Sequence, residues 1–145
     1  MTFTIKRAVD ADAAYRPIWA PLLKFNQDTV GNAQGVPFAL TISSPGSDVI
    51  EGGLWALSLW TSFYIGLVVT PDSARGVGLG SELMRQAEAE ARTRECGHMW
   101  LDTYDFQARP FYERLGFKIF GQIDGPAPMF PRYFMQKCLE ERTLS

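Results

Sequence analysis

Three alternating glycines, Gly76, Gly78 and Gly80, precede a charged helical segment and form a candidate anion-binding turn. The N–H groups of a first helical turn have no partner within the helix, and they converge with the positive helix end on a bound anion. Glycine leaves that backbone bare, so a phosphate can approach it closely. Arg75 adds a guanidinium group, which forms charge-assisted hydrogen bonds with phosphate. The stretch from Ala74 to Ala91 therefore predicts a phosphate site.

Three phosphate-binding turns compete for this pattern. A Walker A turn ends in Gly-Lys-Ser or Gly-Lys-Thr, which this chain lacks. A dinucleotide turn has the spacing GxGxxG directly after a strand, whereas here the spacing is GxGxG and five residues separate Val69 from Arg75. The pattern R-x-x-G-x-G is matched by Arg75, Gly78 and Gly80. An ATP-binding or NAD-binding protein is therefore the weaker alternative.

The helix that follows the turn is predicted from its apolar spacing. Leu79, Leu83, Ala87 and Ala91 recur on one helical face, and Gly97 is the expected end. Two further helices are expected before the turn and one after it: Ala11–Trp19, capped by Asp10 and broken up by Pro17 and Pro21; Leu22–Gln34; and Ala108–Leu115.

The expected strands surround these helices. Residues 52–71 carry no charge over a length that could cross a bilayer, but they are rich in β-branched and aromatic residues and predict two buried strands joined by a turn. The strands are expected at Phe3–Arg7, Pro37–Ser43, Val49–Leu59, Ser62–Val69, Met99–Thr103, Phe117–Ile123 and Arg132–Leu139, with a hairpin turn at Ser43–Asp48. Strands mixed with single helices predict an α/β or α+β fold with a mixed sheet.

Composition restricts the function classes. The 145 residues suit a single domain over residues 1–145, and a net charge of −2 argues against a broad nucleic-acid-binding face or a polybasic membrane anchor. One histidine and two separated cysteines predict no metal site. Unpaired cysteines and the lack of a signal peptide are typical of a reduced, cytoplasmic protein.

Two blocks of the sequence resemble the GNAT superfamily of acyl-CoA N-acyltransferases. The first is LVVTPDSARGVGLGSELM, from Leu67 to Met84, and the second is DFQARPFYERLGF, from Asp105 to Phe117. The resemblance implies a mixed, mostly antiparallel sheet with a splayed parallel strand pair in its centre, flanked by helices. It also implies an enzyme that transfers an acetyl group from acetyl-CoA to a primary amine.

The resemblance implies where acetyl-CoA binds. The pyrophosphate is expected on the N–H groups of the turn, and the pantetheine arm beside the strand that splays from Met99–Thr103. N–H groups left free by the splay would then be in position to donate to the thioester carbonyl, where an oxyanion develops during attack. The implied binding residues are Leu67, Val68, Val69, Arg75, Gly76, Val77, Gly78, Leu79, Gly80 and Ser81.

Catalytic roles follow the second block. Tyr112 occupies the general-acid position of the family, where a phenol can protonate the departing thiolate, although the apolar face around it also suits a core tyrosine. Asp105 stands where the family usually has Asn; it is either a cofactor contact or the cap of the next helix. Many relatives place a glutamate where this chain has Gly66. Glu51 is the predicted base, with Asp102, Asp105 or a water relay as substitutes.

The acceptor is left open by the sequence. A small-molecule or peptide amine is expected, and acyl groups other than acetyl are possible donors. Arg132 and Tyr133 either read an acidic group of the acceptor or belong to an edge strand that supports a homodimer. Without the usual glutamate, a non-catalytic acyl-CoA-binding sensor or regulatory module is the alternative function.

Overall fold

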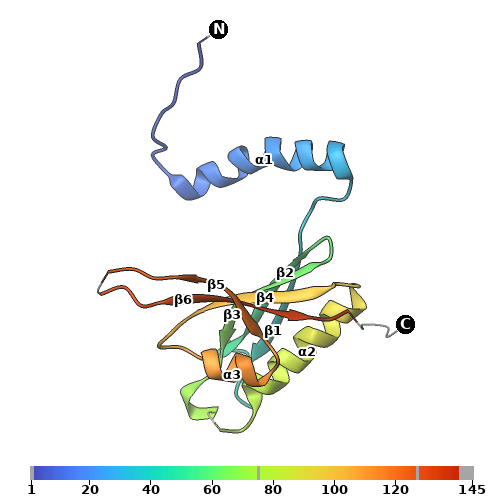
Figure 1. Cartoon of the computed structure of the whole chain (residues 1–145), viewed down its shortest axis with the longest axis vertical. Helices are drawn as coiled ribbons and strands as arrows, with labels where there is room; N and C mark the ends of the chain where they lie inside the picture. The colour runs from blue at the N-terminus through green and yellow to red at the C-terminus, as the bar shows by residue number, and fades with distance from the viewer. Residues whose placement is uncertain (1, 75, 127, 141–145) are drawn as a thin grey trace. The chain divides into compact units, whose positions relative to one another are not determined.

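The computed structural model describes residues 2–74, 76–126 and 128–140. Residues up to Gln34 form one compact unit, and residues from Gly35 onward form another. The first unit contains α1 (Ala11–Val30), and the second contains a sheet with α2 (Leu79–Thr93) and α3 (Arg109–Arg114) (Figure 1). Among the described residues, no helix has the length and apolarity needed to cross a membrane.

The first unit departs from its prediction in two places. The Asp10 cap is confirmed, since its carboxylate accepts a hydrogen bond of 3.1 Å from the N–H of Ala13. However, Pro17 and Pro21 lie inside one continuous helix, because each proline removes one hydrogen bond while its neighbours keep theirs. The strand predicted at Phe3–Arg7 is wrong: the segment pairs with no described strand, and unpaired backbone groups do not form a strand.

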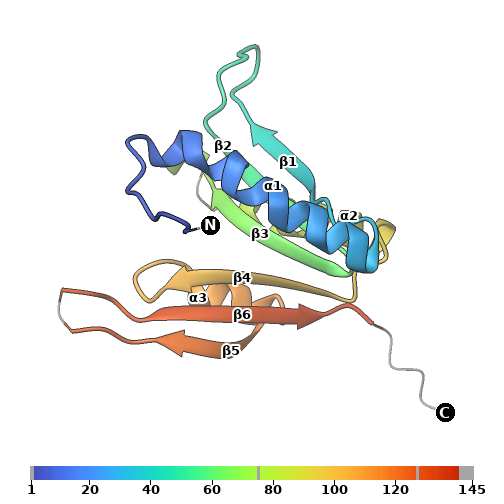
Figure 2. The same cartoon turned by 90° about the horizontal axis from the view of Figure 1, so that it is seen from above.

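The sheet of the second unit has the order β1-β2-β3-β4-β6-β5 (Figure 2). All neighbours are antiparallel except β3 and β4, so the predicted mixed, mostly antiparallel sheet with a central parallel pair is confirmed. The strands are β1 (Val36–Ile42), β2 (Gly52–Leu59), β3 (Ser62–Val69), β4 (His98–Tyr104), β5 (Lys118–Ile123) and β6 (Arg132–Cys138). The uncharged run of residues 52–71 thus forms β2 and β3, as predicted.

The last strand is not an edge strand, which corrects the prediction made for it. β6 lies between β4 and β5, and it pairs with β4 from His98↔Cys138 to Tyr104↔Arg132. Strand order is set by pairing across the whole sheet, and a local pattern of side chains does not encode it.

The parallel pair parts after a short ladder. β3 and β4 pair at Ser62↔His98, Phe63↔Met99 and Tyr64↔Trp100, and the ladder ends there. Beyond these pairs β3 stays with β2, and β4 stays with β6. Figure 2 shows the two strands diverging. The splay implied by the family resemblance is therefore present.

The core lies between the sheet and α2. Phe63, Met99 and Met135 are fully buried, and α2 turns Leu83, Met84, Ala87 and Ala91 towards them. The helix ends at Thr93 rather than at Gly97, because Glu95 adopts a left-handed φ of 59°.

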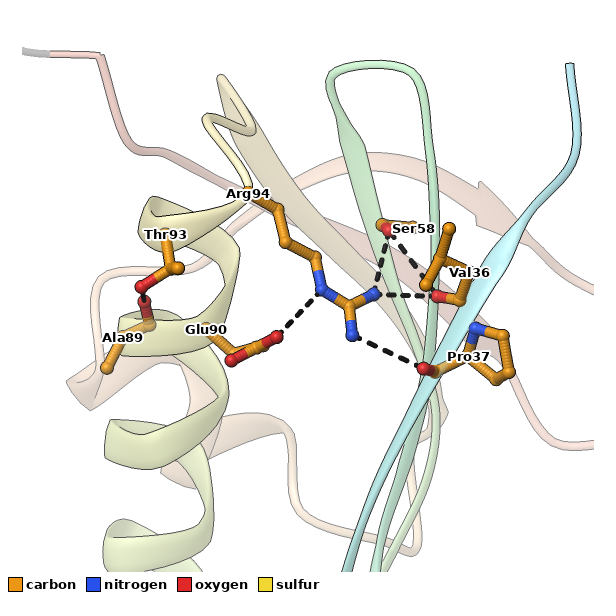
Figure 3. Close-up of polar contacts among 7 residues, drawn as sticks. All are labelled: Val36, Pro37, Ser58, Ala89, Glu90, Thr93 and Arg94. Carbon is orange, nitrogen blue, oxygen red and sulfur yellow. Dashed lines mark hydrogen bonds and ion pairs between the residues drawn. The ribbon is translucent and has the colours of Figure 1, made fainter. Parts of the chain in front are cut away.

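Arg94 joins the end of α2 to the first two strands (Figure 3). Its guanidinium donates to the carbonyls of Val36 and Pro37, at 2.7 and 3.2 Å, and to the Ser58 hydroxyl at 2.8 Å. Its Nε donates to Glu90 at 2.9 Å. This one side chain thereby satisfies backbone carbonyls of β1 that no further strand covers in the described sheet order.

Candidate active site

A cleft of about 450 Å³ lies between the end of β3, the glycine turn and α3. It brings together both blocks of the family pattern. Its lining comprises Val68, Thr70, Ala74, Gly76, Gly78, Leu79, Gly80, Ser81, Ala108, Phe111, Tyr112 and Arg114.

The glycine turn is built by left-handed backbone. Gly76 has a φ of 82° and Gly78 a φ of 78°, values that L side chains rarely adopt. A Cβ on either residue would meet nothing within 4 Å, so conformation rather than space requires glycine in the unliganded protein. Gly80 differs: it is helical, and a Cβ there would lie 3.3 Å from the Phe111 ring.

The start of α2 leaves donors unpaired. No side chain caps the helix, and its first hydrogen bond is donated by Glu82 to the carbonyl of Gly78. The N–H groups of Leu79, Gly80 and Ser81 come before that bond and therefore have no carbonyl within the helix to accept them. All three residues line the cleft, so the positive end of α2 faces its interior.

Tyr112 of α3 also lines the cleft. The residue is 8% exposed and packs edge-on against the rings of Phe111 and Phe117. Its backbone is held at both ends of α3, since its N–H donates to Ala108 and its carbonyl accepts from Phe117. Burial raises the pKa of the Tyr112 phenol, so the group stays protonated at neutral pH and can act as a proton donor.

The other predicted cofactor residues divide into three groups. Val68 lines the cleft, whereas Leu67, Val69 and Val77 are more than half exposed and do not. Gly66 has no partner on β2 and forms a bulge, which changes the face of the sheet to which the following side chains of β3 point. Arg75 lies outside the described residues.

Two predicted acids lie outside the cleft lining. Glu51 is exposed at the end of the β1–β2 connection, where its carboxylate accepts from the N–H of Ser44 at 2.9 Å and from its hydroxyl. Asp105 does not cap α3, because Ala108 is the N-cap residue and no side chain caps the helix. Instead, Asp105 accepts a bond of 3.2 Å from the Tyr133 hydroxyl.

Several lining residues escaped the sequence reasoning. Thr70 and Ala74 flank the turn, and Ala108 and Phe111 belong to the second block, which was the available signal for them. Arg114 follows Tyr112 by two residues and contributes an exposed guanidinium to the cleft. Within the described ranges, no three His, Cys, Asp or Glu residues gather as a metal site would require.

Arg132 pairs with an acid that was not predicted as its partner. Its Nε and Nη2 reach Oδ2 of Asp102 at 2.7 and 2.6 Å, so its charge is met by this chain's own carboxylate. Tyr133, the next residue of β6, points to the opposite face from Arg132 and is buried in the core.

Comparison with known proteins identifies the family. The model of the acetyltransferase (GNAT) family matches residues 17–117. The chain is 32% identical to acetyltransferase Atu2258 of Agrobacterium fabrum over 126 residues, which cover 87% of this chain and 90% of that protein. It is 35% identical over 91 residues to the blasticidin-S acetyltransferase of Streptomyces morookaense, covering 62% of this chain and 67% of that protein.

A solved structure agrees with this assignment. The crystal structure of an acetyltransferase from Agrobacterium tumefaciens matches with a TM-score of 0.83 and 28% identity, over 95% of this chain and 99% of that one. The chain therefore belongs to the GNAT acetyltransferase family, whose members use acetyl-CoA.

Proposed function

We propose that this protein is an N-acetyltransferase that moves an acetyl group from acetyl-CoA directly to a primary amine. The observation that supports the proposal is the cleft itself, whose lining includes both the residues with unpaired donors at the start of α2 and a buried tyrosine. One end of the cleft suits a pyrophosphate, and the other suits a leaving thiolate.

The residues divide the binding of acetyl-CoA between them. The N–H groups of Leu79, Gly80 and Ser81 receive the pyrophosphate oxygens, and Arg114 adds a positive charge to the same cleft. The unpaired edge of β3 beyond Tyr64 offers backbone groups to the pantetheine amides and the thioester carbonyl.

Chemistry follows in three proton-balanced steps. The acceptor ammonium first loses a proton, because only the free amine has a lone pair for attack. The nitrogen then bonds to the thioester carbon, and the carbon–sulfur bond breaks. Tyr112 donates its phenolic proton to the thiolate and recovers one from solvent, while the new amide releases its second proton. The products are an N-acetyl amine and CoA.

Glu51 is the base proposed from sequence. Its hydrogen bonds with Ser44 hold the carboxylate at the β1–β2 connection, outside the cleft lining. Glu51→Gln tests the role: a base is supported by a loss of kcat with unchanged CoA binding, and an unchanged kcat excludes Glu51.

Tyr112→Phe tests the enzyme against its alternative, a non-catalytic acyl-CoA sensor. Phenylalanine keeps the ring packing with Phe111 and Phe117 while removing the proton donor. We expect kcat to fall about 10²-fold or more with an amine that the wild type acetylates. CoA should still raise the melting temperature as it does in the wild type. Stabilisation by CoA without turnover of any amine would favour the sensor. The sensor would also account for Gly66 at the position where many relatives have a glutamate.

The acceptor is proposed to be a small-molecule or peptide amine, in a cytoplasmic protein that forms homodimers. One relative is named a blasticidin-S acetyltransferase, which supports a small-molecule acceptor. The strands β1 and β5 are the described edges of the sheet, and either could pair with a second copy.

A further inference from the structure

The outer face of the sheet, opposite the core, carries an unusual acid. Asp102 is the one acidic residue in the six described strands. Along β4 its neighbours Leu101 and Thr103 are buried towards the core, so Asp102 points to the other face together with Trp100 and Tyr104. Its side chain is 15% exposed.

Asp102 stands where the two central strands part. Trp100 is the last residue of β4 that pairs with β3, through Tyr64, and Asp102 is the next β4 residue on the same face. Two residues beyond Tyr64 on β3 stands Gly66, which has no side chain. A Cβ on Gly66 would lie 2.9 Å from the Trp55 ring, so that ring takes the space a side chain would need.

The carboxylate is held in place from two sides. Both bonds from Arg132 go to the same oxygen, Oδ2, so Oδ1 takes no part in this pair. On the other side lies the Tyr64 phenol, whose pKa is raised by burial first and then by the negative charge of Asp102 and a hydrogen bond with it. A carboxylate fixed beside an opening between strands is a suitable partner for an ammonium group.

Aromatic rings surround this carboxylate. Tyr64 and Trp100 stack with centroids 4.3 Å apart. Arg132 already lies over Tyr104 and Phe134, at 5.6 and 5.1 Å from their centroids, so these ring faces accept a cation.

An open groove of about 440 Å³ lies on the same face of the sheet and includes the cross-strand partner of Asp102. It is lined by His98, Trp100, Phe120, Phe134 and Gln136. Phe134 is the direct cross-strand partner of Asp102, and such partners have Cβ atoms about 5 Å apart. The groove is large enough for one or two flat rings.

We propose that the acceptor is an amine that carries a flat unsaturated ring, with its ammonium bound by Asp102 at the splay and its ring against Phe134 and Trp100. This inference rests on the proposed function and specifies the substrate class. The spacing of the two groups calls for a short chain of about two to four atoms between ring and nitrogen.

Three probes separate charge from ring. Phenylpropylamine has both a ring and an ammonium, hexylamine has the ammonium alone, and phenylbutanoate has the ring with a carboxylate. Their binding is measured by saturation-transfer NMR titration on the full chain with CoA present, and their acetylation by CoA release. We expect phenylpropylamine to bind at least about tenfold more tightly than either of the others.

Two variants assign the effect to residues. Asp102→Asn should weaken phenylpropylamine at least about tenfold and leave phenylbutanoate unchanged or tighter, a reversal that a merely structural role would not produce. Phe134→Leu should reduce the advantage of phenylpropylamine over hexylamine. The matched controls are Asp48→Asn, an exposed acid in the β1–β2 connection, and Phe130→Leu, an exposed ring; neither residue belongs to the groove lining.

Other outcomes overturn the inference. Equal binding of the three probes, no binding of phenylpropylamine, or an unchanged preference in Asp102→Asn each refutes it. The thermal shift with CoA is recorded on every variant and distinguishes the two hypotheses. A wild type that CoA does not stabilise refutes the proposed function, whereas stabilisation by CoA without amine discrimination refutes the acceptor class alone.

Discussion

Gly78 offers a direct test of the phosphate turn, because an alanine there would change conformation and little else. The residue has a φ of 78° and a ψ of 15° at the N-cap of α2, and a Cβ would meet no atom within 4 Å. A left-handed alanine costs about 1–2 kcal/mol. In a chain of this length, that cost should lower the melting temperature by about 3–6 °C.

The same substitution has a matched control in another turn. Gly46 has a φ of 75°, also with nothing within 4 Å of its Cβ, and it lies in the β1–β2 connection outside the cleft lining. Gly46→Ala should therefore lose a similar amount of stability without any effect on CoA.

The two variants should differ in CoA affinity. Alanine either stays left-handed, and its cost appears as lost stability, or it lets the Gly78 turn relax. In the second case binding must restore the left-handed form at a cost of about 1–2 kcal/mol, which corresponds to about 5-fold to 30-fold weaker binding. Calorimetric titration with CoA measures this, and thermal unfolding without ligand measures the shared loss of stability. Wild-type affinity in a Gly78→Ala protein that has lost no stability would refute the assignment of the turn to phosphate binding, because a relaxed turn would then bind CoA as well as the left-handed one.

Two further predictions concern stability and pH. Arg94→Met should lower the free energy of unfolding, measured in urea, by about 2–4 kcal/mol, because the carbonyls of Val36 and Pro37 lose a charged donor. The control Lys24→Met, at an exposed ion pair, should cost less than about 0.5 kcal/mol. Equal losses in the two variants would contradict the stabilising role of Arg94. The raised pKa of Tyr112 means that the folded state holds the phenolic proton more tightly than the unfolded chain, so its contribution is intact below about pH 10 and is lost as pH rises further. Tyr112→Phe should then unfold less readily than the wild type between about pH 10 and 12, and an identical alkaline unfolding curve would contradict this.

Much of the candidate site was predictable because its signals are local. The left-handed turn requires glycine, and α2 begins directly after it at Leu79, as the apolar spacing predicts. Pro110 in the first turn of the short helix that carries Tyr112, and Gly116 after its end, are there for similar local reasons. Family resemblance then joined two segments that local signals alone leave separate.

The remainder depended on contacts between distant residues. Arg132 meets Asp102 across 30 positions because β6 inserts beside β4, and no local pattern specifies that order. The same pairing brings Tyr133 to Asp105, which turns an expected helix cap into a hydrogen-bond acceptor. Glu51 was predicted as the base because it is a carboxylate, but its place in the β1–β2 connection directs that carboxylate to Ser44.

The sequence by itself determined the class of protein, the glycine turn before α2 and most strands, because each depends on residue type and short-range geometry. Tertiary structure decided where the parallel ladder ends, which cleft the turn and Tyr112 share, and which acid stands at the splay. Those features follow from strand order and register, whose energies come from pairing and packing over the whole sheet.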